Sequence, residues 1–459
     1  MTVASGVERL SASLRGQLIH PSDPDYEEAR HVVNAMIDRR PRFIVRAVDT
    51  ADVTASVNFA REEGLVLSIR GGGHGVPGFA TNDEGLVIDL LRMKGIRVDP
   101  NNRTATAQGG CTWGDLDHAT HAFGLATPGG VVSTTGIAGL TLGGGIGHLT
   151  RKCGLSCDNL VSADVVLADG SFVVANESEN ADLFWALRGG GGNFGVVTSL
   201  EFRLHEVSIV YAGPVLWTVE RAADAMKFAR EFIRDAPEDL NVVLAFLRVP
   251  PGEPFPQHLH DKNMLGAIVC YAGPLETAEE VVKPLREFGP PAFVGLGPMP
   301  FPVLQSAFDA VAPLGFHNYW KGDFVAELSD EVIDAHAKFG PDVPNMFSGA
   351  HIFSISGAAH RVGKSETAWS YRDANFSHIV FALEPDPANM PKHTEWVRDY
   401  WSALHPYSAG GAYVNFLMDE GEDRVASSYR DNYNRLAEVK KKYDPGNLFR
   451  MNQNIKPAA

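Results

Sequence analysis

His74 follows three consecutive glycines at the end of an apolar run, in the segment VLSIRGGGHG. Glycine lets backbone N–H groups turn toward an anion without interference from a Cβ atom. The glycines at 71–73 and 75 therefore predict a cradle for a diphosphate group. A dinucleotide-binding βαβ fingerprint is not indicated, because no helix opens directly after these glycines and no acidic residue follows at the required distance.

Two further segments are unusually rich in glycine. ATPGGVVSTTGIAGLTLGGGIGHLTRKCGLSCDNL has nine glycines between Gly129 and Gly154, and DLFWALRGGGGNFGVVT has four in a row. Such density is unfavourable in backbone entropy, and a large flat cofactor lying against bare backbone would explain it. Mobile surface loops are the alternative, but the interspersed apolar residues weigh against them. Three such segments in one half of the chain favour a long ligand held by several turns.

The four cysteines predict neither a disulfide scaffold nor a metal site. Cys111, Cys153, Cys157 and Cys270 are too few and too scattered for a chain of 459 residues, so reduced thiols are expected. Cys153 and Cys157 form a C-x3-C pair, but no second pair or nearby histidine cluster completes a zinc site of the usual spacing. We expect no metal.

The elements that must position these segments follow an α+β pattern. Short β-rich runs alternate with glycine-rich turns from about residue 40 to 206, and helices are expected at 50–64 and 112–124. Longer strands interleaved with helices follow Glu206 and indicate a second domain. The proline-rich cluster 289–302 is expected to be an ordered loop, and 423–442 a single charged helix.

Composition excludes some classes of partner. The chain is 44% hydrophobic and 21% charged, as in soluble globular proteins, and its length favours more than one packed unit. A formal net charge of -16 repels phosphate polymers and anionic lipids, so neither nucleic acid nor a membrane surface is expected as a partner. No targeting segment or long apolar run is recognised, which predicts a cytoplasmic protein.

Taken together, these segments resemble the FAD-linked oxidases with the fold of vanillyl alcohol oxidase and p-cresol methylhydroxylase, and specifically the bacterial berberine bridge enzyme-like group. The similarity covers nearly the whole chain. Its most specific parts are Arg70–Gly75, Gly136–Leu160, Asp182–Thr198 and the carboxy-terminal AYVNFL and KKYDPGNLFRMNQNI. The resemblance implies an FAD-binding domain in two parts, residues 1–206 and 406–459, around a substrate-binding domain of residues 207–405. That middle domain should hold an antiparallel sheet backed by helices.

The resemblance also implies how the flavin is held. In that family the histidine after the glycine triplet bonds to the C8-methyl carbon of FAD, and His74 stands at this position. A neutral imidazole nitrogen can add to the electrophilic methide tautomer of oxidised flavin. Many relatives make a second bond from a cysteine four residues before Gly136, where this chain has Val132. Cys153 replaces a common family tyrosine and is not assigned that bond. We expect FAD attached through His74 only.

Noncovalent flavin contacts carry over by motif position. Around the diphosphate these are Arg70, Gly71, Gly72, Gly73 and Gly75. Along the isoalloxazine and ribityl groups they are Ser133, Thr134, Gly136, Gly139, Gly143 and Gly144. Val197 would hold the adenine end, and the remaining contacts expected are His148, Asn415, Asn452 and Asn454.

The family oxidises C–H bonds next to a hydroxyl or amine by hydride transfer to the flavin, and oxygen then reoxidises the flavin to give hydrogen peroxide. Such a reaction needs a general base and a dry pocket. Many relatives have a carboxylate on the strand that here reads HIFSISGAAH, which offers no Asp or Glu. The candidates for the base are Tyr413, favoured because its strand is expected beside the flavin, then Tyr319, Lys321, His351 and His360.

Thr135 aligns with the residue that is thought to gate oxygen in this family, and its small side chain favours an oxidase. The aromatic second half of the chain favours an enclosed apolar pocket and a small secondary-metabolite substrate. A carbohydrate oxidase of the same fold, an oxygenating flavin-N5-oxide enzyme and a non-catalytic protein that sequesters a small molecule are the alternatives. The expected partners are a small substrate and molecular oxygen, in a monomer or homodimer.

Overall fold

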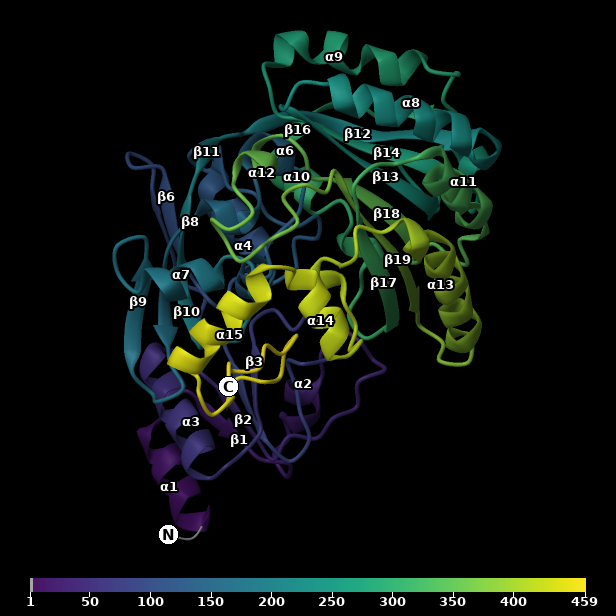
Figure 1. The fold of residues 1–459 in the computed structure, drawn as a ribbon. Helices are drawn as coiled ribbons and strands as arrows, with labels where there is room; N and C mark the ends of the chain where they lie inside the picture. Colours follow the sequence, from purple (N-terminus) through teal and green to yellow (C-terminus); the bar gives the residue numbers. More distant parts are fainter. Residues whose placement is uncertain (1–2) are drawn as a thin grey trace.

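A computed structural model describes residues 3–459 of the chain and confirms the α+β class (Figure 1). Strands between residues 17 and 206 form three sheets, which occupy the left side and the lower centre of Figure 1. Strands between residues 209 and 384 form one eight-stranded sheet at the upper right. The glycine-rich segments therefore belong to the first three sheets, and the large sheet is a separate part of the fold.

The first sheet carries His74 at the end of one of its strands. Its order is β1-β2-β4-β3, in which β2, β4 and β3 run parallel. Helix α3 beside it is capped by Asp49, whose side chain accepts a hydrogen bond from the backbone N of Asp52. The bounds are α1 (Val3–Ser13), β1 (Gln17–Ile19), α2 (Tyr26–Arg30), β2 (Phe43–Arg46), α3 (Thr50–Glu62), β3 (Leu67–Arg70) and β4 (Leu86–Asp89).

The second sheet supports the other two glycine-rich segments. It is antiparallel, in the order β5-β6-β10-β8-β9, and a two-stranded pair β11-β7 lies outside it. A capping box between Thr112 and Asp115 starts the expected helix α4. The bounds are β5 (Ile96–Asp99), β6 (Thr104–Gln108), α4 (Trp113–His121), β7 (Leu125–Ala126), α5 (Ile137–Leu142), α6 (Thr150–Cys153), β8 (Leu160–Val166), β9 (Phe172–Asn176), α7 (Ala181–Leu187), β10 (Val196–Arg203) and β11 (His205–Glu206).

The large sheet is antiparallel throughout, in the order β15-β12-β14-β13-β18-β19-β17, with β16 paired to β12. Helices α8, α9, α11 and α13 cover one face of it and share a hydrophobic core with it (Figure 1). The bounds are β12 (Ile209–Thr218), α8 (Ala222–Asp235), β13 (Leu240–Arg248), β14 (Asn263–Tyr271), α9 (Leu275–Glu287), β15 (Phe293–Val294), β16 (Gly297–Pro300), α10 (Phe301–Gln305), β17 (His317–Val325), α11 (Asp330–Phe339), β18 (Gly349–Ser354), α12 (Ala358–Arg361), β19 (Phe376–Glu384) and α13 (Met390–Leu404). The proline-rich cluster is thus ordered, and it contributes two short strands to the sheet.

The carboxy-terminal segment differs from its prediction. The single helix expected at 423–442 is wrong, because the chain turns at Arg430, whose φ of 47° lies in the left-handed region. Two helices result, α14 (Glu422–Tyr429) and α15 (Asn432–Tyr443), shown in yellow in Figure 1. Helix α15 returns to the amino-terminal half and packs beside α7. The strand expected at Tyr413–Asn415 is instead a 3-10 turn, Val414–Phe416.

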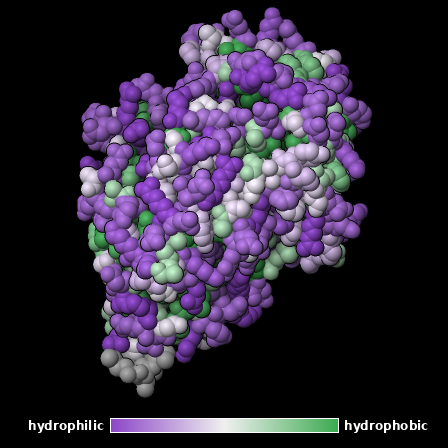
Figure 2. All heavy atoms as spheres, in the orientation of Figure 1, coloured by the Kyte–Doolittle hydropathy of each residue, from purple (hydrophilic) through white to green (hydrophobic). Residues whose placement is uncertain are grey.

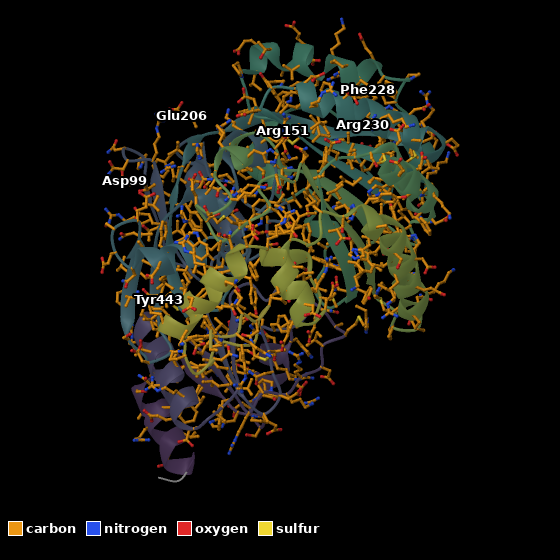
Figure 3. The ribbon with its side chains drawn as sticks, in the orientation of Figure 1. Asp99, Arg151, Glu206, Phe228, Arg230 and Tyr443 are labelled. Atoms are coloured by element: carbon orange, nitrogen blue, oxygen red, sulfur yellow. The ribbon has the colours of Figure 1, made fainter. Side chains whose placement is uncertain are left out.

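Buried arginine joins the amino-terminal half to the large sheet. Arg151 on α6 is labelled in Figure 3, and its guanidinium donates to the carbonyl oxygens of Leu240, at 2.6 Å, and Ala236, at 3.1 Å. Its Nε also donates to the hydroxyl of Ser356, at 3.1 Å. The two halves are therefore connected by directed hydrogen bonds as well as by packing.

The surface is predominantly hydrophilic on the face shown in Figure 2, with hydrophobic residues scattered among charged ones. Across residues 3–459, no helix is both long and apolar enough to cross a membrane.

Candidate active site

A cavity of about 340 Å³ lies between the glycine-rich segments, the large sheet and the carboxy-terminal segment. Its walls bring together most of the residues expected to hold the flavin. The residues expected at the site that line the cavity are Gly71, Gly72, Gly73, His74, Gly75, Thr135, Gly136, Gly139, Tyr413, Asn415 and Asn452.

Glycines at this cavity serve two different purposes. A Cβ atom on Gly72 would lie 2.4 Å from the backbone N of Gly136, and a Cβ on Gly136 would lie 2.4 Å from the backbone N of Gly72. These two loops touch backbone to backbone, which no side chain would permit. At Gly75, Gly139 and Gly192 a Cβ would meet nothing within 4 Å. Bare backbone there faces open space, as a cradle for a large flat group requires.

His74 is placed to contact such a group. Its side chain is half-buried at the cavity wall, and its Nε2 atom is buried with no hydrogen-bond partner among residues 3–459. Burial lowers the pKa of His74 below its usual value, which favours the neutral imidazole that nucleophilic attack needs. Val132 lines the same cavity, so an apolar side chain stands where a second, cysteinyl bond would form. The residues present therefore fit an FAD that is attached through His74.

Some expected flavin contacts have other partners. The buried guanidinium of Arg70 forms a 2.7 Å ion pair with the buried Asp89 and so holds β3 to β4. Ser133 bonds to the carboxylate of Asp309, through its backbone N at 2.8 Å and its hydroxyl at 2.5 Å. Thr134 is exposed and does not line the cavity. These three residues therefore shape the cavity wall without facing it.

The remaining expected contacts are packed behind the wall. A Cβ on Gly143 would lie 2.3 Å from Oδ1 of Asn415, and one on Gly144 would lie 2.7 Å from the Trp369 ring. Both glycines therefore make room for protein side chains. The residues His148, Val197 and Asn454 do not line the cavity either; the first two are buried, and Asn454 is half-buried.

Tyr413 and Asn415 form a small hydrogen-bonded unit at the wall. The Tyr413 hydroxyl accepts from the backbone N of Gly145, at 2.8 Å, and from Nδ2 of Asn415, at 2.7 Å. Burial raises the pKa of Tyr413 well above its usual value, so the hydroxyl keeps its proton at neutral pH. With two donors already bound, that proton is free to be donated. Tyr413 therefore suits a donor better than the base for which it was the leading candidate.

Strand geometry separates the other candidates for the base. Trp320 on β17 lines the cavity, so its neighbours Tyr319 and Lys321 point to the opposite face of the sheet. The Tyr319 hydroxyl accepts from Arg398 Nε at 3.1 Å, and Lys321 Nζ lies 2.6 Å from a carboxylate oxygen of Glu420. A base role does not fit the placement of either residue. Tyr319 and Lys321 are residue types that can act as a base, but the alternation of side chains along β17 turns both away from the cavity.

His351 lies on the cavity side of the sheet. It shares a face of β18 with Phe353, which lines the cavity, whereas Ala350 and Ile352 belong to the core under the helices. Burial lowers the pKa of His351 to about 4, so its imidazole is neutral at pH 7. His360 lies on α12 and bonds through Nε2 to the carbonyl oxygen of Ala374, at 3.0 Å, away from the cavity wall.

Several residues at the site escaped sequence reasoning. Gly191 and Gly192 line the cavity; their run of four glycines was assigned to a ligand-holding segment, but neither residue was named as a contact. Met451 and Gln453 line it between the asparagines of MNQNI. Asp309 supports the wall from 176 residues away in the sequence, and a lone acidic residue in a loop carries no pattern that could have revealed it.

Within residues 3–459, no three His, Cys, Asp or Glu side chains gather as potential metal ligands. The four cysteines are free in the structure.

Comparison with known proteins defines the class. Residues 41–176 match the FAD binding domain, and residues 412–456 match the berberine and berberine-like domain. An FAD-linked oxidoreductase of Dictyostelium discoideum is 30% identical over 98% of this chain and 97% of that protein. The fold and the matches define an FAD-dependent oxidoreductase of the vanillyl alcohol oxidase fold.

Solved structures agree with this class. The crystal structure of 6-hydroxy-D-nicotine oxidase from Arthrobacter nicotinovorans has a TM-score of 0.87 and 30% identity, covering 97% of this chain and 99% of that chain. Glucooligosaccharide oxidase from Acremonium strictum, whose FAD is 6-S-cysteinyl and 8α-N1-histidyl, has a TM-score of 0.88 and 25% identity, covering 99% of this chain and 100% of that one. The chain belongs to the berberine bridge enzyme-like family of FAD-linked oxidoreductases, as the resemblance implied.

Proposed function

We propose that this enzyme is an oxidase that removes a hydride from a C–H bond next to a hydroxyl or amine of a small apolar molecule and passes the electrons to oxygen. The observation that carries this proposal is one cavity whose wall joins His74 and bare glycine backbone to the aromatic side chains of Trp320, Phe353 and Phe416. The relatives named as oxidases, acting on hydroxynicotine or on glucooligosaccharides, support the reaction type. Bound FAD supplies the hydride acceptor.

His74 alone tethers the cofactor in this proposal. Its unpartnered Nε2 and its lowered pKa favour attack by a neutral imidazole. Val132 offers no thiol for a second bond. The glycine backbone at 75, 139 and 192 then holds the rest of the cofactor without covalent chemistry.

Two residues, Tyr413 and His351, offer hydrogen-bonding groups to the substrate. Tyr413 keeps its proton and donates a hydrogen bond into the cavity, since its oxygen already accepts two bonds. His351 is neutral and stands on the cavity side, so the unprotonated nitrogen of its ring can accept a hydrogen bond from a substrate hydroxyl or amine. Thr135 at the cavity wall has a small polar side chain that leaves room for oxygen.

The test begins with the colour and mass of the purified protein. We expect a yellow protein whose flavin stays attached after acid denaturation, with the mass adduct on the peptide that contains His74. His74→Ala should lose all covalent flavin, whereas the exposed His118→Ala should keep it.

Activity is then tested without knowledge of the substrate. The enzyme is photoreduced under argon and mixed with air, and we expect reoxidation with about one hydrogen peroxide per flavin. A flavin adduct on another peptide would contradict the tether. Failure to reoxidise in air would contradict the oxidase and favour the alternative of a protein that sequesters a small molecule.

A further inference from the structure

The loop that carries His74 is held in place by another part of the chain. Residues 71–81, which we name the histidine loop, contain five glycines and form neither a helix nor a strand. Glycine leaves the backbone more conformational freedom than any other residue. A loop of this composition does not fix the direction of a side chain by itself. Its hydrogen bonds to other segments therefore decide where His74 lies.

Residues 31–39 run along the histidine loop and bond to its backbone. We name them the bracing segment. The backbone N of Val33 donates to the carbonyl oxygen of Gly73, at 3.1 Å. The guanidinium of Arg39 donates to the carbonyl oxygen of Gly78, at 3.0 Å. The first bond lies one residue before the histidine and the second four residues after it, so the loop is held on both sides.

Asn34 is the residue of the bracing segment that reaches furthest across the fold. Its side chain is buried, and its Nδ2 donates to the carbonyl oxygens of Val76, at 2.9 Å, and Asn318, at 3.1 Å. Its Oδ1 accepts from the backbone N of Asn318, at 2.9 Å, and of Met36, at 3.0 Å. The amide therefore uses two donors and two lone pairs, its full capacity. Asn34 thus joins the histidine loop to β17, the strand that brings Trp320 to the cavity wall.

Backbone hydrogen bonds reinforce this connection to the large sheet. The backbone N of Gly315 donates to the carbonyl oxygen of Val33, at 3.1 Å, and the backbone N of Ala35 donates to that of Phe316, at 2.9 Å. The bracing segment therefore lies between the histidine loop and the start of β17, with directed bonds to both.

The imidazole of His74 has no chemical assistance from a neighbouring side chain at Nε2. This buried nitrogen has no hydrogen-bond partner among residues 3–459. Burial lowers the pKa of His74, and the negative charge of Asp309 opposes that shift only through space. With no base in contact, the rate of bond formation depends on where the imidazole is held, because correct placement supplies much of the rate of such a step.

We propose that Asn34 is a positioning residue for the covalent attachment of FAD, because it holds the backbone of Val76 against β17 and so directs the imidazole of His74 at the cofactor. This rests on the proposed tether through His74 and names a residue on which that tether depends. In the attachment, a C–H bond of the C8-methyl group and the N–H bond of the imidazole are replaced by a C–N bond. The two electrons and two protons released pass to molecular oxygen, which becomes hydrogen peroxide.

The experiment measures how fast the bond forms. The full-length protein is produced in riboflavin-starved cells, mixed with FAD in air and quenched with acid at intervals. Mass spectrometry then gives the fraction of the His74 peptide that carries flavin. We expect Asn34→Ala to form the adduct roughly 10–100 times more slowly than the wild type, which is the effect of misplacing reacting atoms by about 1 Å.

Two further variants isolate the bond to the histidine loop. Asn34→Asp keeps an oxygen for the bonds that Oδ1 accepts and loses the bond to Val76, so it should also be slow. Asn263→Ala is the matched control. The side chain of Asn263 likewise joins separate segments, donating to the carbonyl oxygens of Pro341, at 2.7 Å, and Val343, at 3.0 Å, but it lies outside the cavity wall. Asn263→Ala should form the adduct at the wild-type rate.

A binding measurement separates positioning from support of the fold. FAD is titrated into His74→Ala and into the double variant His74→Ala with Asn34→Ala, and binding is followed by flavin fluorescence. Both should bind FAD with equal affinity, because neither has the imidazole that Asn34 positions. Weaker binding by the double variant would show that Asn34 shapes the cofactor site itself, and the positioning role would be wrong.

The remaining outcomes separate this proposal from the tether. Attachment at the wild-type rate in Asn34→Ala, equal slowing in Asn263→Ala, or loss of folding or of FAD binding in both Asn34 variants would overturn the role of Asn34 and leave the tether intact. A wild-type protein that forms no adduct on His74 overturns the tether, and the role of Asn34 then fails with it.

Discussion

At the scale of single residues, burial without partners is the feature that recurs among the histidines of this chain. His148 is 2% exposed, and neither of its ring nitrogens has a hydrogen-bond partner among residues 3–459. Burial lowers the pKa of His148 to about 4. In the unfolded chain the pKa of this histidine takes its usual value of 6.5. Between the two pKa values, the unfolded state is therefore protonated at His148 and the folded state is not.

We therefore expect His148 to make the protein less stable in acid. As pH falls from 6.5 to about 4, the unfolded state gains a proton that the folded state does not, and the free energy of unfolding should drop by roughly 3 kcal/mol from this residue. His148→Leu should remove that part of the pH dependence, and His118→Leu, at an exposed position, should keep it. Urea denaturation at pH 7.5, 5.5 and 4.5 measures the difference. Parallel pH profiles for wild type and His148→Leu would contradict the expectation.

At the scale of elements, the glycine loops have two functions that a sequence does not distinguish. Gly72 and Gly136 allow two loops to touch, and Gly75 leaves backbone open to the cavity. The first function supports the fold, and we propose that the second serves the cofactor. Gly72 and Gly75 illustrate both functions within one glycine-rich motif, where they stand three residues apart.

Two alanine variants should separate these functions. Gly72→Ala places a Cβ 2.4 Å from the backbone N of Gly136 and should lower the free energy of unfolding of the flavin-free protein by about 2 kcal/mol or more. Gly75→Ala meets nothing within 4 Å and should leave that stability within about 0.5 kcal/mol while reducing the fraction of protein that carries flavin. Urea denaturation and the ratio of absorbance at 450 and 280 nm give the two readouts. The reverse pattern would show that Gly75 supports the fold and Gly72 the cofactor.

At the scale of the whole molecule, the site exists only because two halves of the chain meet. The glycine loops come from the amino-terminal half, Trp320 and Phe353 come from the large sheet, and the carboxy-terminal segment closes the wall between them (Figure 1). Arg151 fastens this arrangement, since its buried guanidinium bonds to two carbonyl oxygens and a hydroxyl of the sheet region (Figure 3). Substitution of Arg151 therefore tests whether the two halves of the chain unfold together.

We expect Arg151→Met to lower the free energy of unfolding by roughly 3 kcal/mol, because it leaves buried carbonyl oxygens without donors. Arg151→Lys should recover part of this loss. The exposed Arg234→Met is the control and should change stability by less than about 0.5 kcal/mol. Differential scanning calorimetry checks the result, and a split of one transition into two in Arg151→Met would show that the halves unfold separately. An unchanged melting temperature would contradict the coupling.

The sequence by itself determined the family, the α+β class and the glycine loops that line the cavity. Those features are local: a glycine run, a capped helix or an alternating strand depends on neighbouring residues, so the segment around His74 was readable from the chain. The predicted ends of helices and strands were less accurate, as the break at Arg430 and the turn at Val414–Phe416 show. Tertiary contacts decide where an element ends.

Only the tertiary structure decided which side chains face the cavity. Tyr319 and Lys321 were plausible by residue type, but the register of β17 turns them away and places Trp320 at the wall. The hydrogen bond between Ser133 and Asp309 and the ring contact between Phe353 and Phe416 join residues far apart in the sequence. A one-residue step along a strand reverses the direction of a side chain, and the packing of separate segments sets that register.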